Sequence, residues 1–183
     1  MDADEITARL NEVYSGEREA EEWVRPARAR DIPALVELMR EFYAESGFPL
    51  PEENARRTFE TLLGDPRLGG VWLMEADGEP VGHVVLTVCF SMEYGGLRGF
   101  VDDLFVRPRF RGRGLAAAGL AALRADAEAR GVRALLVEAG PANDVALRVY
   151  RRAGFEDGGH LLMTLPLATP VHLTESPSLE PFP

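Results

Sequence analysis

The chain has 183 residues, 46% of them hydrophobic and 27% charged, a composition typical of one globular domain. The formal net charge is −10, and residues 1–22 supply most of it with eight acids and two arginines. Duplex binding depends on neutralising phosphates, so this balance argues against a nucleic-acid partner. No run approaches the ~18–20 apolar residues of a membrane helix, and the acidic start is unlike a secretory signal. We expect a cytoplasmic protein with no membrane segment.

The cysteine and histidine content indicates neither a disulfide nor a metal site. Cys89 is the only cysteine and lies within an apolar run, which predicts a buried structural thiol. It has no neighbouring histidine or helix N-terminus to activate it as a nucleophile. The three histidines, His83, His160 and His172, lack metal-ligand spacing, so we expect no metal.

The first half of the chain predicts two helices followed by antiparallel strands. Asp31 is placed as the N-cap of the first helix, and Asp77-Gly78 is a strong hairpin signal between two apolar runs. The expected elements are an acidic, partly helical extension at 1–22, a short strand at 23–27, helices at 31–47 and 51–64, and strands at 71–75, 81–90 and 98–106.

The second half predicts alternating helices and strands. Alanine, the best helix former, dominates one segment, and Gly131 follows it as a usual helix stop. The expected elements are an arginine- and glycine-rich loop at 107–114, a helix at 115–130, a strand at 134–139, a helix at 143–152, a last strand at Leu161–Leu165, and a Pro-rich tail at 168–183. This order predicts an α+β architecture with a mixed sheet.

The loop at 107–114 has the composition of a pyrophosphate site. Gly112 and Gly114 allow the backbone to turn its N–H groups toward an anion, and the helix that follows adds its positive end. Arg109, Arg111 and Arg113 place permanent charge around the loop. The loop is neither a Walker motif, since no G-K-[ST] follows, nor a dinucleotide fingerprint, which needs a third glycine and a later acid.

Two motifs resemble the GNAT superfamily of acyl-CoA-dependent N-acetyltransferases. Arg109-x-x-Gly112-x-Gly114 matches the superfamily's [RQ]-x-x-G-x-[GA] after its fourth strand. Asn143, followed by Tyr150 and then Gly154-Phe155, matches its second motif in order and spacing. The resemblance covers residues 23–167 and includes some likeness to polyamine and other small-amine acetyltransferases.

The resemblance implies a GNAT fold, an α/β sandwich whose mixed, mostly antiparallel sheet splays open between the strands at 101–106 and 134–139. Acetyl-CoA is expected in that opening as the co-substrate. The residues expected to hold it are Leu104, Phe105, Val106, Arg109, Arg111, Gly112, Arg113, Gly114, Leu115, Ala116, Ala117 and Asn143.

The superfamily pattern implies that Tyr150 donates a proton to the departing thiolate. A phenol can fill this role, since it is protonated at neutral pH. Asp102 is our candidate for the base that deprotonates the amine. Asp103, Glu138 and a water relay remain alternatives, and a regular strand would point Asp102 and Asp103 to opposite faces. We expect direct transfer in a ternary complex.

Acids near the cleft favour a cationic, small-molecule primary amine as the acceptor. Phe48, Phe90, Met92 and Tyr94 are candidates to line an apolar acceptor pocket, with core or rim packing as the alternative. A protein or peptide amine acceptor, a non-catalytic acyl-CoA-binding sensor and a partner-binding protein acting through residues 1–22 remain alternative functions. Superfamily members often dimerise through sheet edges or swapped ends, which makes a homodimer an expectation.

Overall fold

The computed structural model describes residues 23–159 and 161–167. The acidic extension at 1–22 and the tail at 168–183 lie outside the described residues. The elements are β1 (Val24–Pro26), η2 (Ala29–Asp31), α3 (Ile32–Glu45), α4 (Glu52–Gly64), β2 (Gly69–Ala76), β3 (Glu79–Ser91), β4 (Gly96–Val106), η3 (Pro108–Phe110), α5 (Leu115–Ala129), β5 (Leu135–Val137) and α6 (Asp144–Arg152).

The five strands form one mixed sheet in the order β1-β2-β3-β4-β5. The strands β1 to β4 pair with one another in antiparallel fashion, and β5 runs parallel to β4. This arrangement confirms the predicted mixed, mostly antiparallel sheet. Asp77 and Gly78 both have positive φ, 54° and 78°, as a two-residue hairpin turn of type I′ requires, so this prediction is confirmed as well.

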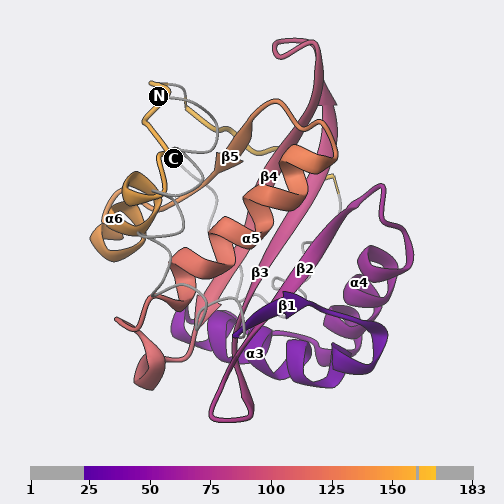
Figure 1. The fold of residues 1–183 in the computed structure, drawn as a ribbon, viewed down its shortest axis with the longest axis vertical. Helices are drawn as coiled ribbons and strands as arrows, with labels where there is room; N and C mark the ends of the chain where they lie inside the picture. The colour runs from indigo at the N-terminus through magenta and orange to yellow at the C-terminus, as the bar shows by residue number, and fades with distance from the viewer. Residues whose placement is uncertain (1–22, 160, 168–183) are drawn as a thin grey trace, which may run out of the picture.

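Two apolar clusters cover the two faces of the sheet. Alternate residues of β2 face opposite sides, so Trp72 and Met74 belong to one cluster and Val71 and Leu73 to the other. The first cluster includes buried residues of α5, and the second includes buried residues of α3 and α4. Figure 1 shows this layering, with α5 across one face and α3 and α4 behind the sheet. The helices therefore flank the sheet as the sandwich prediction requires.

Asp31 has a different role from the predicted one. It precedes α3, but its side chain makes no capping bond to that helix. Its carboxylate instead accepts hydrogen bonds from both terminal nitrogens of Arg25, at 2.8 and 2.9 Å, and from the backbone N–H of Arg28. Arg25 also bonds Glu75 of β2, so the acid fastens the start of α3 to the sheet instead of capping it.

Two other sequence predictions are wrong. Cys89 is exposed, because it lies two residues before the end of β3, next to the β3–β4 connection, and its thiol accepts a bond from Arg98 Nε. Residues 161–165 form no strand. The edge strand of the sheet, β5, has only three residues and so offers little edge with which they could pair. Large apolar side chains from 161 to 167 are consequently left exposed, namely Leu161, Leu162, Met163, Leu165 and Leu167.

Candidate active site

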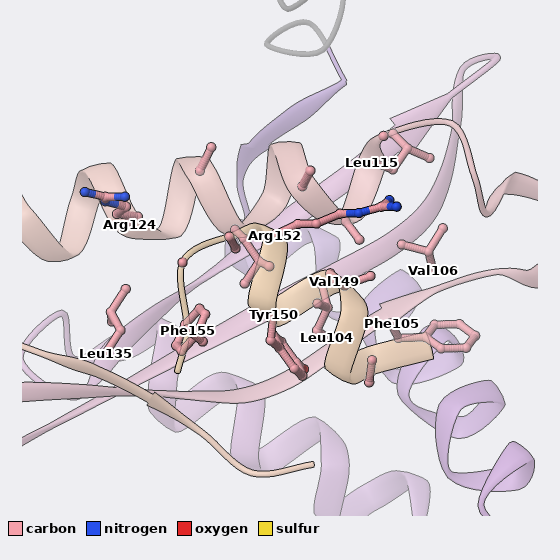
Figure 2. A pocket seen from close by; sticks show the side chains of 18 of the residues that line it. Leu104, Phe105, Val106, Leu115, Arg124, Leu135, Val149, Tyr150, Arg152 and Phe155 are labelled. Carbon is pink, nitrogen blue, oxygen red and sulfur yellow. The ribbon is translucent and has the colours of Figure 1, made fainter. Parts of the chain in front are cut away.

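The sheet opens where the parallel pairing of β4 with β5 ends. That pairing runs from Gly99–Leu135 to Val101–Val137 and does not continue along the second half of β4. A cavity of about 1670 Å³ lies beside this half, larger than the roughly 300–1000 Å³ of an ordinary ligand pocket. Leu104, Phe105 and Val106 of β4 line it together with Val149 and Tyr150 of α6, and Figure 2 labels these side chains. The cavity therefore suits a long ligand that can contact the strand backbone.

The glycine-rich loop meets this cavity at the start of α5. Gly112 and Gly114 have φ of 78° and 87°, and a Cβ on either would meet nothing within 4 Å. No side chain caps the helix, and its first intrahelical hydrogen bond joins Ala118 N–H to the Gly114 carbonyl at 3.0 Å. The N–H groups of residues 115–117 thus have no intrahelical partner. Backbone donors and a helix dipole at an open cavity make an anion site.

Three arginines around this loop are paired with carboxylates. Arg107 bonds Glu41 at 2.7 Å, Arg109 bonds Glu79 at 3.0 Å, and Arg111 bonds Glu45 at 2.7 Å. These pairs partly offset the charge of the three arginines, so the backbone N–H groups and Arg113 contribute much of the positive character of the loop.

Two arginines expected at the cofactor do not line the cavity. The guanidinium groups of Arg109 and Arg113 both lie over the Phe110 ring, at 4.7 and 5.1 Å from its centroid. Contact of these two side chains with a cofactor stays a prediction. The other expected cofactor residues do line the cavity: Leu104, Phe105, Val106, Arg111, Gly112, Gly114, Leu115, Ala116, Ala117 and Asn143.

Helix α6 closes the far side of the cavity and positions Tyr150. Asn143 caps this helix, with its Oδ1 accepting a bond from Ala146 N–H at 3.1 Å. Tyr150 is 9% exposed, and its ring packs edge-on against Phe155 at 5.7 Å. Burial, aided by the negative charge of Asp103, raises the pKa of Tyr150 to about 12. The phenol is therefore protonated at neutral pH and can donate a proton.

A β-bulge in β4 changes the expected arrangement of the two aspartates. Val85 pairs with Asp103 and Leu86 pairs with Val101, so Asp102 is the extra residue and strict alternation is lost. Neither aspartate lines the cavity. The side chain of Asp102 reaches solvent, but the surrounding protein partly desolvates it. This desolvation, together with the negative charge of Asp103, raises the pKa of Asp102. A raised pKa makes a carboxylate a better base near neutral pH.

Sequence reasoning missed two residues that lie near these aspartates. Burial, followed by the charges of Asp103 and Asp102, raises the pKa of Tyr43 on α3 to about 12. The side chain of His83 on β3 is fully buried, with Nε2 3.9 Å from Asp103 Oδ2. A lone polar residue in the apolar run Val81–Leu86 was the available signal for His83. No pattern distinguished Tyr43 from the other aromatic residues of its helix.

The remaining candidates lie away from the cavity. Glu138 follows β5 and is exposed. Phe48, Phe90 and Met92 are exposed and Tyr94 is half-buried, and none of the four lines the cavity.

Comparison with known proteins identifies the family. The model of the acetyltransferase (GNAT) family matches residues 32–155. The chain belongs to this family. A crystallised integron cassette protein, HFX_CASS3, from the mobile metagenome of Cole Harbour Salt Marsh is 53% identical, with a TM-score of 0.76 over 82% of this chain and 93% of that one.

Two more distant solved structures share the fold. A predicted acetyltransferase from Clostridium acetobutylicum, solved with acetyl-CoA, is 21% identical over 78% of this chain and 94% of its own, with a TM-score of 0.67. The aminoglycoside N-acetyltransferase AAC(6′)-Iy, solved with CoA, is 20% identical over 79% of this chain and 94% of its own, with a TM-score of 0.68. Its membership of the GNAT family makes the protein an acetyl-CoA-dependent N-acetyltransferase.

Metal sites and membrane-spanning helices are both absent from the part of the chain that the structure describes. Across residues 23–159 and 161–167, no group of three or more His, Cys, Asp or Glu side chains could hold a metal ion. In the same residues, no helix has the length and apolar character to span a membrane.

Proposed function

We propose that this acetyltransferase moves the acetyl group directly to a primary amine of a small molecule, in a complex that holds both substrates. One observation carries the proposal: the uncapped start of α5, the backbone of β4 and the phenol of Tyr150 all border one cavity. The pyrophosphate of acetyl-CoA would bind the N–H groups of the loop and of residues 115–117. Its pantetheine arm would lie along residues 104–106. The Val106 carbonyl already accepts a bond from Arg111 Nε at 2.8 Å, which orients the loop for this ligand.

The residues divide the proton transfers between them. Acetyl-CoA supplies the acetyl group and leaves as the free thiol. Asp102 accepts the proton that the ammonium must lose before its lone pair can attack, and passes it to solvent. Tyr150 donates its phenolic proton to the sulphur as the carbon–sulphur bond breaks, and regains one from the nitrogen of the new amide. Every atom transferred is then accounted for without a covalent enzyme intermediate.

The charge around the acceptor side supports a cationic substrate. Asp102 and Asp103 lie together on β4, and no arginine pairs with either within residues 23–159 and 161–167. An ammonium would therefore be attracted to this part of β4, next to the cavity-lining residues 104–106. AAC(6′)-Iy, whose name describes an aminoglycoside acceptor, has a similar fold, and this likeness adds modest support for a small polycationic amine.

A homodimer is the second part of the proposal. Five large apolar side chains between 161 and 167 are at least 59% exposed, and Leu161, Met163, Leu165 and Leu167 exceed 80%. A contiguous exposed apolar segment commonly marks an interface. A second copy of the chain would cover it.

The decisive experiment is amine-dependent release of free thiol from acetyl-CoA. Purified protein would be assayed with separate pools of polyamines, aminoglycosides, amino acids and short peptides. Tyr150→Phe should lower kcat about 10²-fold or more, because general-acid catalysis contributes about that much. Tyr94→Phe is the matched control, since Tyr94 lies on the β3–β4 connection and does not line the cavity.

The pools separate the competing functions. Activity only with peptides would replace the small-molecule acceptor by a protein amine. Acetyl-CoA binding without release in any pool would indicate a sensor. Equal rates for Tyr150→Phe and Tyr94→Phe would refute the role of Tyr150.

A further inference from the structure

His83 is a buried polar residue without a hydrogen-bond partner. Its side chain is 0% exposed, and neither ring nitrogen has a partner. These two nitrogens are the only buried side-chain nitrogen or oxygen atoms without a partner in residues 23–159 and 161–167. Aromatic rings enclose the imidazole, with Phe59 of α4 and Phe105 of β4 each 6.3 Å away between centroids. Unpaired buried polar groups are costly and uncommon, so the position of His83 calls for a functional reason.

Asp103 is the charged group next to this imidazole. His83 pairs across the sheet with Phe105, two residues along β4 from Asp103, so the two side chains are diagonal neighbours on one face. Nε2 lies 3.9 Å from Asp103 Oδ2, which is too long for a hydrogen bond. A small rotation of either side chain would close the gap. The Asp103 side chain is 13% exposed, so this carboxylate is largely shielded from water.

The titratable groups that face this pair come from three further positions. Asp102 is adjacent on β4, and Tyr43 approaches from α3 and Tyr150 from α6, as the effect of Asp103 on each of their pKa values shows. None of them is a cation: Asp102 is a second carboxyl group, and the protonated phenols of Tyr43 and Tyr150 can donate a hydrogen bond but carry no positive charge. Phe59 of α4 contributes only an apolar ring. His83 adds an imidazole nitrogen beside the Asp103 carboxylate, with Nε2 3.9 Å from Oδ2, and this nitrogen has no other partner.

We propose that His83 is a positioning residue that donates its Nε2–H to Asp103 and holds this carboxylate in place next to Asp102. The inference rests on the proposed function, in which Asp102 takes the proton of the ammonium. Two adjacent carboxylates titrate as a coupled pair, so a donor to one changes the proton affinity of both. Removing the donor makes the doubly ionised pair harder to form. Removing the charge of Asp103 makes ionisation of Asp102 easier.

The two changes should therefore shift the pH dependence of kcat/KM in opposite directions. With one amine acceptor throughout, His83→Leu should move the acidic limb about one pH unit upward, a roughly tenfold loss on the acidic side of the limb with little change at high pH. Asp103→Asn should move the limb downward. His83→Gln, which keeps an amide N–H at a similar reach, should retain most of the wild-type profile. In the Asp103→Asn background, His83→Leu should have no further effect on the limb.

A second measurement does not depend on activity. The chain has only three histidines, so ring ¹⁵N resonances can be assigned with the His83→Leu variant. We expect the Nε2–H tautomer of His83 in the wild type and a different tautomer balance in Asp103→Asn. A Nδ1–H tautomer, or an unshifted limb in His83→Leu, would overturn the proposal. If no amine is acetylated, the proposed function fails, and the tautomer still decides whether His83 serves Asp103.

Discussion

The two glycines that bound α5 allow a test of the phosphate loop against a matched control. Gly114 precedes the helix with φ of 87°, and Gly131 follows it with φ of 74°; a Cβ on either would contact nothing within 4 Å. An alanine forced into this left-handed region costs about 1–2 kcal/mol, partly offset by about 0.4–1 kcal/mol from a stiffer unfolded chain. We therefore expect Gly114→Ala and Gly131→Ala to lower stability by a similar ~1 kcal/mol, or about 2–4 °C in Tm.

Only Gly114 lines the cavity, so the two variants should differ in ligand binding. If the loop relaxes to relieve the strain, binding must restore its left-handed form at a cost of about 1–2 kcal/mol. Acetyl-CoA titrated calorimetrically should then bind Gly114→Ala about 5–30-fold more weakly than wild type, and Gly131→Ala within about twofold of it. Equal affinities in both variants, with equal losses of Tm, would show that the loop does not hold the pyrophosphate.

Two further predictions concern the rest of the chain. The bonds from Arg25 hold the pKa of Asp31 at about 2, below its usual value of 3.8, so its contribution to stability is present above about pH 4 and is lost as the pH falls toward 2. Asp31→Asn should accordingly lower the free energy of unfolding, measured in urea at pH 6, by about 1–2 kcal/mol after allowing for the partial exposure of Arg25. The difference between variant and wild type should become smaller by pH 3. A difference that stays constant over this range would refute the role of the Arg25–Asp31 pair. Met163→Glu should convert a homodimer to a monomer in light scattering coupled to size exclusion, whereas a wild type that is already monomeric would contradict the proposed interface.

The fold could be predicted wherever local chemistry determines the structure. The Asp77-Gly78 turn, the alanine-rich α5 and its glycine stop each depend on a few neighbouring residues, and each is found as expected. Predictions that depend on distant partners were less successful. Asp31 has the right chemistry for an N-cap, but Arg25 from β1 competes for the same carboxylate. The predicted strand at 161–165 needed an edge to pair with, and no residue pattern reveals that β5 is three residues long.

In the candidate site too, local motifs could be predicted from the sequence and contacts between distant residues could not. The loop and Tyr150 were found because they belong to motifs read along the chain, and they border one cavity. The alternation rule misplaced Asp102 relative to Asp103 because a bulge is a property of the β3–β4 register. The pairing of Arg111 with Glu45 joins residues 66 positions apart, so the sequence could not show that the arginine is already neutralised. His83 was considered only as a metal ligand, since its neighbour Asp103 comes from another strand.

The charge of Asp103 serves the acid and the base of the proposed reaction at once. It raises the pKa of Tyr150 and that of Asp102, because a nearby negative charge favours the protonated form of any acid. For Tyr150 this keeps the phenol protonated up to high pH, while it also makes the phenol a weaker acid toward the departing sulphur. For Asp102 it strengthens the hold on a proton taken from the ammonium. The same charge attracts the cationic acceptor, so one ionised carboxylate links substrate binding to both proton transfers. Asp103 is largely shielded from water, and the proposed donation from the buried His83 would give its carboxylate a partner there.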